Sequence, residues 1–292
     1  MRILPTGTQY EIRAGHTTAV VGEVGATLRS FRVRDREILA TYSDDEPFSP
    51  WRGTTLTPWP NRIRDGRYVF DGVEYRLPIN EHERNCALHG LGHAVEWRLL
   101  HRQPDSVSLA TVIYPQPGWA GCLRMEITYS VRGDALSVEH EASNVGEITV
   151  PYGYGAHPYF AFDDLAKVSL SLPFQKQLLV DNRLLPKRID ELETQFDFRA
   201  PHKIGDVSFD TAFTEGPKDW EIRLAAPSHT VTVWADQHHP WAQLHSPEDR
   251  TSLAVEPMTC GPDAFNDGPT RGDLVQLAPG QSFAGRWGVR VR

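Results

Sequence analysis

The chain has 292 residues, 40% of them hydrophobic, which is enough to bury a substantial core and excludes an intrinsically disordered protein. Its formal net charge of -8 argues against nucleic acid or an anionic membrane as a partner, because both bind clustered lysine and arginine, and the sequence has no such cluster. A small, neutral ligand fits this composition better.

The N-terminus and the cysteines indicate the compartment. Pro5 comes too early for the apolar stretch of a signal peptide, and no apolar run approaches membrane-spanning length. Cys86, Cys122 and Cys260 are odd in number and lack the paired spacing of a zinc site or a disulfide framework, which is typical of a reducing environment. We therefore expect a cytoplasmic protein that does not bind a membrane.

Apolar and polar residues alternate with a period of two along the chain, whereas amphipathic helical patterns are almost absent. Asp71-Gly72 predicts a tight turn between two short strands at 67–70 and 73–77. A second hairpin is predicted from strands at 125–131 and 135–141. Further strands are predicted at 17–33, 97–101, 107–114, 167–172, 220–224, 230–235, 241–245, 253–256 and 283–291.

The least regular stretch is 185–201, in which 188–192 is compatible with one helical turn or with a loop. Many strands without helical crossovers favour antiparallel sheets packed face to face, so we expect an all-β fold, a large antiparallel β-sandwich with long loops on its rim. The prolines and glycines are scattered and not gathered into a linker. The sequence thus predicts a single domain, residues 1–292.

His157 is the most informative candidate for chemistry. It lies between a glycine-containing approach and Pro158, with Tyr159 and Phe160 behind it, so its backbone is constrained. An imidazole that is fixed in a pocket can give or take a proton near neutral pH. The alternative is a hydrogen-bonded core histidine, and other candidates elsewhere in the chain have to decide between the two.

Residues 57–64 predict a rigid polar loop. Asn61 and Arg62 offer donors to hydroxyl oxygens, and Trp59 offers a flat apolar face of the kind that sugars lie against. The alternative for Arg62 is an ion pair with a structural carboxylate. His89 follows in a glycine-rich loop, four residues before His93. A metal site at these two histidines is disfavoured, because the spacing needs a helix and the glycines oppose one.

Two carboxylates complete the set of candidates. Asp210 lies between aromatic residues, where a carboxylate can equally satisfy backbone amides. Glu256 follows an apolar strand, and Pro257 is expected to end the pairing there, which would leave Glu256 at a strand end facing a cavity. Burial would raise the pKa of Glu256 and make it a better base at neutral pH. The alternative is a buried glutamate neutralised by an arginine.

Taken in order, five segments of the chain resemble motifs of the aldose 1-epimerase family, the galactose mutarotases. They are Pro60-Asn61-Arg62-Ile63, Leu88-His89-Gly90, Gly155-Ala156-His157-Pro158-Tyr159-Phe160, Phe209-Asp210-Thr211-Ala212-Phe213 and Glu256-Pro257-Met258-Thr259. The resemblance extends to the closing segment 277–282 and so covers nearly the whole chain. The residues around Glu256 and the compact spacing of the motifs resemble the bacterial branch of the family.

The resemblance implies a β-supersandwich that interconverts the α and β anomers of a free aldohexose, with neither metal nor cofactor. It implies Glu256 as general base and His157 as general acid. It implies sugar-binding roles for the remaining candidates, which are Asn61, Arg62, His89, Asp210 and Gln243. We expect Glu256 and His157 to enter one cleft from different strands or loops, about a sugar ring's width apart.

Other functions stay open at this point. A glycoside hydrolase needs two carboxylates, so Asp210 would have to be the second. A non-catalytic carbohydrate-binding protein would need neither His157 nor Glu256 as a proton carrier. A phosphorylated hexose would need an extra cation, for which Arg64 or Arg67 is available. The preferred aldose, and whether the protein is a monomer or a homodimer, are not encoded in these motifs.

Overall fold

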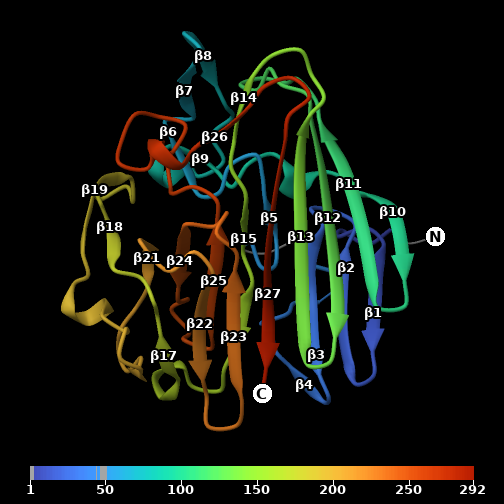
Figure 1. Cartoon of the computed structure of the whole chain (residues 1–292), viewed down its shortest axis with the longest axis vertical. Coiled ribbons are helices and arrows are strands. Elements are labelled where there is room, and N and C mark those ends of the chain that lie inside the picture. The colour runs from blue at the N-terminus through green and yellow to red at the C-terminus, as the bar shows by residue number, and fades with distance from the viewer. Residues whose placement is uncertain (1–2, 44, 47–50) are drawn as a thin grey trace.

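Two large antiparallel sheets form the body of the protein in the computed structural model, which describes residues 3–43, 45–46 and 51–292 (Figure 1). The nine-stranded sheet contains, in spatial order, β10 (Arg98–Gln103), β11 (Ser106–Ile113), β12 (Leu123–Arg132), β13 (Ala135–Asn144), β27 (Ser282–Val291), β23 (Thr230–Ala235), β22 (Trp220–Ala225), β17 (Ser169–Ser171) and β20 (His202–Lys203). The eight-stranded sheet contains β19 (Pro186–Glu191), β18 (Lys176–Val180), β21 (Asp210–Thr214), β24 (Trp241–His245), β25 (Ser252–Met258), β15 (Gly155–Ala156) and β5 (Thr55–Leu56), with β16 (Tyr159–Ala161) also paired to β25. The predicted all-β class and antiparallel sandwich are confirmed.

Smaller sheets and short turns complete the fold. One sheet contains β1 (Gln9–Ala14), β2 (Thr17–Gly22), β3 (Thr27–Val33) and β4 (Arg36–Glu37), and three pairs are β6 (Arg62–Arg64) with β9 (Cys86–Leu88), β7 (Arg67–Phe70) with β8 (Val73–Arg76), and β14 (Val150–Tyr152) with β26 (Val275–Leu277). In the described ranges the helical segments are the 3-10 turns η1 (His82–Arg84), η2 (Gly92–Ala94), η3 (Leu165–Lys167), η4 (Thr194–Phe196) and η5 (Arg271–Asp273). No helix among these residues is long and apolar enough to cross a membrane.

One hydrophobic core joins the two large sheets. Val138 of β13 and Trp287 of β27 belong to the same cluster of buried side chains as Leu253 and Val255 of β25. The indole Nε1 of Trp287 donates a hydrogen bond of 2.9 Å to the hydroxyl of Tyr154, which ties the large sheet to the segment that leads into β15. Such a core fits one domain, although the extent of 1–292 stays a prediction.

The strand β25 has two buried faces, and this arrangement positions the site. All of its residues are buried, and because side chains alternate along a strand, Leu253 and Val255 face the core while Glu256 and Met258 face the other way. On that second face Met258 packs with Leu178 in a separate small cluster. Glu256 therefore lies among apolar neighbours on the side of the sheet away from the main core.

Both predicted hairpins are confirmed, as β7–β8 and β12–β13. The prediction of one strand over 17–33 is wrong, because Gly25 and Ala26 adopt positive φ angles of 70° and 45° and turn the chain between β2 and β3. The prediction of a helical turn or loop at 188–192 is also wrong. This stretch lies largely in β19, where pairing with β18 along its length overrides the local preference.

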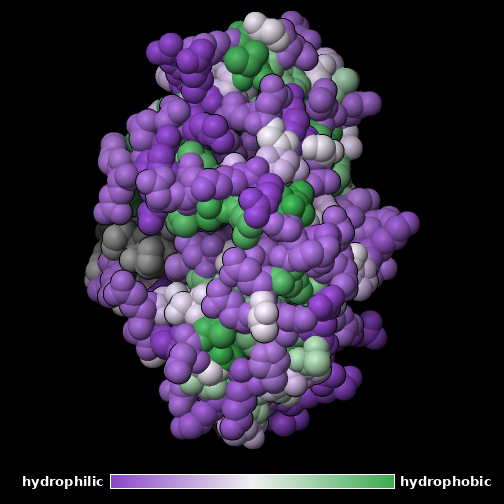
Figure 2. All heavy atoms as spheres, turned by 90° about the vertical axis from the view of Figure 1, so that its left-hand side faces the viewer, coloured by the Kyte–Doolittle hydropathy of each residue, from purple (hydrophilic) through white to green (hydrophobic). Residues whose placement is uncertain are grey.

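Figure 2 shows the side of the molecule that carries β18 and β19. Its surface is mainly hydrophilic, and hydrophobic residues reach it as small separate patches. A polar surface of this kind is consistent with the composition of the chain, in which 23% of residues are charged.

Candidate active site

The second face of the eight-stranded sheet carries two rows of side chains that cross neighbouring strands. In the first row Gln243 of β24 pairs with Glu256 of β25 on one side and with Ala212 of β21 on the other. The second row contains, in order, Asp210, His245, Ala254 and Tyr159. Paired residues that are 9 to 95 positions apart in sequence are thus brought together by strand register alone.

His157 lies beside Glu256 at a gap in the hydrogen-bond ladder. Gly155 pairs with Met258 and Tyr159 pairs with Ala254, and the same register continued across the gap sets His157 opposite Glu256. Pro158 and Pro257 have no N–H to donate, which explains the gap.

Two sequence-based expectations about this region are wrong. Pro257 does not end the strand, since β25 continues to Met258 and Pro257 pairs with Ala242 on the other side. The acid and the base are also not a sugar ring apart, because His157 Nε2 lies 3.4 Å from Glu256 Oε1. The shared register of the two strands brings these side chains into direct contact.

Burial governs the protonation of this pair. The Glu256 side chain is 2% exposed, and desolvation, followed by the negative charge of Asp210, raises its pKa well above the usual value. Desolvation, followed by the charge of His245, lowers the pKa of His157 to about 3. Both shifts favour a protonated carboxyl beside a neutral imidazole as the resting form of the pair. Glu256 Oε2 and His157 Nδ1 are buried and have no hydrogen-bond partner within the described part of the chain.

Asn61, just before β6, and His89, just after β9, are joined by two hydrogen bonds. Both take positive φ angles, 57° and 62°, which are uncommon for residues other than glycine and cluster at functional sites. The His89 N–H donates to the Asn61 carbonyl at 2.9 Å, and the Asn61 N–H donates to His89 Nδ1 at 3.1 Å. In the neutral ring the proton is thus on Nε2, which can only donate. Burial, followed by the charges of His157 and Arg62, lowers the pKa of His89 well below the usual value and keeps the ring neutral.

Arg62 forms the ion pair that the sequence left open, and it also lies at the candidate site. Its guanidinium forms a forked ion pair with Glu81, with two distances of 2.8 Å, and both side chains are largely buried. It also lines a small cavity together with Asp210 and Gln243. There Gln243 Nε2 donates to Asp210 Oδ1 at 2.8 Å, which orients that carboxylate.

The rings of His89 and His157, with centroids 5.3 Å apart, connect this cavity to the Glu256 pair. The structure thus brings all the predicted site residues together on one side of the eight-stranded sheet. What each of them does there stays a prediction.

Other residues near this network differ from expectation. Trp59 is wrong as a sugar platform, because it is 3% exposed and packs against Phe265 in the core. Aromatic contact at the site comes instead from Trp51, whose ring lies 4.8 Å from that of His89, and from Tyr159, whose ring stacks on His157 at 4.8 Å. His245 was missed, although its alternation with Gln243 along one strand could have indicated it. Glu81 was missed because no local pattern links it to Arg62.

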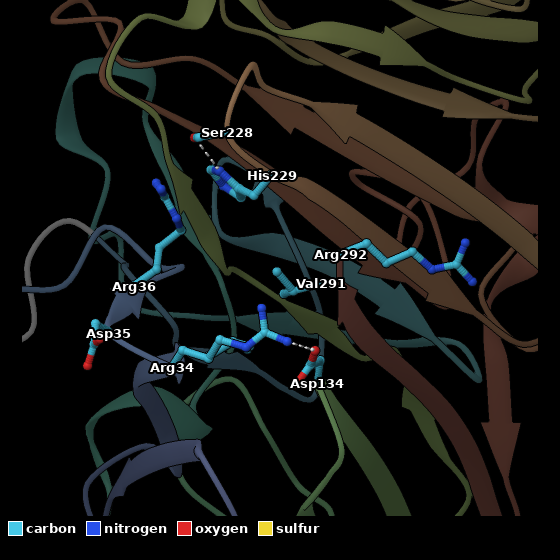
Figure 3. A pocket seen from close by; sticks show the side chains of 9 residues that line it. Arg34, Asp35, Arg36, Asp134, Ser228, His229, Val291 and Arg292 are labelled. Atoms are coloured by element: carbon cyan, nitrogen blue, oxygen red, sulfur yellow. Dashed lines mark hydrogen bonds and ion pairs between the residues drawn. The ribbon is translucent and has the colours of Figure 1, made fainter.

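A separate pocket of about 560 Å³ shares no residue with this network. Figure 3 shows Arg34 pointing toward Asp134 and Ser228 beside His229. The distance from Arg34 Nη2 to Asp134 Oδ2 is 3.5 Å. The lining comes from hairpin turns and the C-terminal strand, and its charges are largely exposed. This pocket lacks the buried acid and base of the first network.

The model of the aldose 1-epimerase family matches residues 8–289. The chain belongs to this family. It is 32% identical to YihR of Escherichia coli K12 over 94% of this chain and 91% of that protein. It is 27% identical to galactose mutarotase of Rattus norvegicus over 69% of this chain and 64% of the rat protein.

A crystal structure of galactose 1-epimerase from Lactobacillus acidophilus has the same fold, with a TM-score of 0.82 and 20% identity over 97% of this chain and 94% of that one. Family membership makes the protein an isomerase that acts on an aldose. The family model covers both Asn61 and Glu256. The resemblance seen in the sequence motifs is thereby confirmed over nearly the whole chain.

Proposed function

We propose that this member of the aldose 1-epimerase family interconverts the α and β anomers of a free aldohexose, with His157 and Glu256 as the proton-transfer pair. The observation that carries the proposal is the 3.4 Å contact between the two side chains, both buried and each with an unpartnered polar atom in the described structure. Buried titratable groups whose pKa values are pushed apart are typical of acid and base catalysis.

The reaction needs two proton transfers and no other chemistry. Glu256 as carboxylate takes the proton of the C1 hydroxyl, His157 as imidazolium gives its proton to the ring oxygen, and the bond between C1 and the ring oxygen breaks to leave an aldehyde. Rotation about the bond between C1 and C2, followed by the reverse steps, closes the ring on the other face. Each proton transfer contributes roughly 10²- to 10⁴-fold to the rate.

The active proton distribution differs from that of the resting pair by one transfer. The resting pair is a protonated Glu256 beside a neutral His157, and moving this proton across 3.4 Å gives the carboxylate and imidazolium that the reaction uses. A bound sugar favours the transfer because its hydroxyls solvate both charges, which apolar surroundings do not. The nearby Arg62 guanidinium also lowers the pKa of Glu256 and supports the carboxylate form.

Three side chains beside the His157 and Glu256 pair fit the sugar hydroxyls. His89 presents a fixed Nε2 donor, and Arg62 presents a guanidinium held by Glu81. Asp210 accepts from Gln243 through Oδ1, and its second oxygen can accept from a hydroxyl. These groups favour a polyhydroxylated, uncharged substrate.

The alternatives are less well supported. A retaining or inverting hydrolase would place its carboxylates on either side of the scissile bond, about 5 to 9.5 Å apart, whereas Glu256 has a histidine in contact and Asp210 is oriented by Gln243. For a phosphorylated hexose, Arg64 and Arg67 are both engaged by carboxylates, Asp263 and Glu74. A cytoplasmic location remains part of the proposal and is consistent with three free cysteines.

Polarimetry tests the proposed activity. Fresh α-glucose and α-galactose should reach their equilibrium rotation faster with the protein than without it, at a rate proportional to protein concentration. The same samples should show no change in sugar composition by chromatography, and an aryl glycoside should release no phenol. Release of new reducing ends would identify a hydrolase and contradict the proposal.

A further inference from the structure

The cavity that Arg62, Asp210 and Gln243 line is closed on one side by apolar side chains from a turn. Val180 ends β18, and Leu184 belongs to the turn of residues 181–185 between β18 and β19, which we call the roof turn. The cavity between these side chains has a volume of about 10 Å³, which is about the space of a single water molecule. The site therefore ends at the roof turn.

Hydrogen bonds within the roof turn hold its shape. The carboxylate Oδ1 of Asp181 accepts hydrogen bonds from the N–H groups of Arg183 and Leu185, at 2.8 and 2.9 Å. Leu184 has a φ of 59°, an uncommon conformation for a leucine. Strained backbone of this kind persists only where the surroundings hold it, and it clusters at ligand clamps.

Arg183 holds the roof turn to the opposite side of the cavity. Its Nε donates to the carbonyl of Arg84 at 3.0 Å, and its Nη2 donates to Asp65 Oδ1 at 2.7 Å and to the carbonyl of Asn85 at 3.2 Å. Asp65 follows β6, and Asn85 precedes β9, the two strands that begin and end next to Arg62 and His89. The arginine thus links the turn directly to the two-stranded sheet of β6 and β9, next to which Arg62 and His89 lie.

The position of the roof turn relates it to one end of the substrate. Strand order runs β18, β21, β24, β25, and Glu256 is on β25 while the roof turn follows β18. Gln243 of β24 and Ala212 of β21 lie between Glu256 and the roof turn, and Leu178 of β18 lines the same small cavity. A sugar with C1 at Glu256 therefore directs the opposite side of its ring, at C4, toward Leu184.

We propose that the roof turn restricts the substrate to a single sugar ring, with Leu184 as a specificity-determining residue and Arg183 as the positioning residue that holds it. This inference rests on the proposed function. A second ring attached at C4 would occupy the space of Leu184 and Val180, which the Arg183 hydrogen bonds keep in place. A free aldohexose ends before that point.

The test compares glucose with maltose, whose reducing glucose carries a second ring at C4. Leu184→Gly removes the side chain, and glycine adopts the positive φ of this position without strain. Arg183→Gln removes the guanidinium that ties the roof turn to the segments next to β6 and β9. Both variants should raise the ratio of kcat/KM for maltose to that for glucose by about 10-fold or more, the size of discrimination that pocket shape commonly gives. Arg188→Gln is the matched control, since Arg188 is an exposed arginine of β19 that pairs with Asp190 on its own strand, and its ratio should equal that of the wild type.

Several outcomes would overturn the proposal. If the wild-type protein has equal kcat/KM values for the mutarotation of maltose and of glucose, no such restriction exists. If Leu184→Gly leaves the ratio within twofold of wild type, or if Arg183→Gln lowers Tm without changing the ratio, the turn is structural only.

If the wild type accelerates neither sugar, the proposed function has failed, and the roof turn is then judged by binding. Titrations followed by tryptophan fluorescence should show wild type binding glucose more tightly than maltose, and Leu184→Gly narrowing that difference. Equal binding of the two sugars by the wild type, or binding of neither, would reject the roof turn as well.

Discussion

His157 and Glu256 face each other across a break in the sheet, with His157 Nε2 3.4 Å from Glu256 Oε1. The break arises because Pro158 and Pro257 remove two backbone donors from adjoining strands. Both side chains lie in the same low-dielectric environment, where burial pushes the pKa of Glu256 up and the pKa of His157 down. The two groups are coupled, and both shifts favour the state in which the pair holds one proton and carries no net charge.

Glu256→Gln should lower kcat by at least about 10²-fold with a smaller effect on KM, because the amide keeps the shape of the side chain but cannot accept the proton. Polarimetry over a range of sugar concentrations separates the two constants. A near-normal rate would mean that another group is the base.

The same variant should be more stable than the wild type at pH 7. In the unfolded chain a glutamate loses its proton near pH 4.3, whereas the folded protein keeps the Glu256 proton to higher pH, so the wild type loses stability as pH rises between the two pKa values. Gln has no proton to lose. Thermal unfolding should show a higher Tm for Glu256→Gln at pH 7 and a difference that shrinks as the pH approaches about 4.3. An equal or lower Tm at pH 7 would show that Glu256 is already ionised in the folded protein.

His157→Asn should reduce kcat to a similar degree, and the variant with both substitutions should be little worse than either single one. Residues that work as a unit are far from additive, because removing one partner already disables the other. Fully additive losses would indicate independent roles. A rise in KM alone for His157→Asn would make His157 a binder, and another group would have to donate the proton.

The pH dependence follows from the single shared proton. The resting pair takes up a second proton near the lowered pKa of His157, about 3, and loses its only proton at the raised pKa of Glu256. After subtraction of the uncatalysed rate, kcat/KM should stay level through mildly acidic pH and fall as pH rises through the raised pKa of Glu256. A rate that instead rises with pH across that range would describe a base acting alone.

Arg62→Ala and Asp210→Ala should each weaken transition-state binding by about 1–3 kcal/mol, the usual cost of deleting one hydrogen-bonding partner of a bound group. Glu81→Gln tests the support of Arg62 without touching the sugar, because it replaces a charged fork with a neutral one. It should lower kcat/KM and Tm together. If Arg62 is only a structural partner of Glu81, the Arg62→Ala variant will have a lower Tm, while kcat and KM of its folded fraction equal those of the wild type.

Chelation should leave the activity unchanged. Proton transfer by His157 and Glu256 requires no Lewis acid, and His89 Nδ1 already accepts the Asn61 N–H. Within the described ranges no group of three or more His, Cys, Asp or Glu side chains is arranged to hold a metal ion. Loss of polarimetric activity on dialysis against EDTA, restored by a divalent ion, would refute the metal-free mechanism.

The sequence predicted the strands well where alternation and turn residues coincided, as in the hairpin around Asp71-Gly72. It failed at 188–192, where the strand is defined by its partner β18 and not by its own pattern. The motifs identified His157 and Glu256 as site residues. They could not predict that the two side chains are in direct contact, because the register across a gap with two prolines is a property of the folded sheet. Glu81 is a similar case, since its contact with Arg62 forms only in the folded protein.

The single proton of the His157 and Glu256 pair has a consequence for the direction of catalysis. After ring closure on either face the proton is back on the pair, so both anomers leave behind the same form of the protein. No recovery step separates one turnover from the next, and neither direction is privileged by the protein. The final anomer ratio is then a property of the sugar in water, and the protein changes only how soon it is reached.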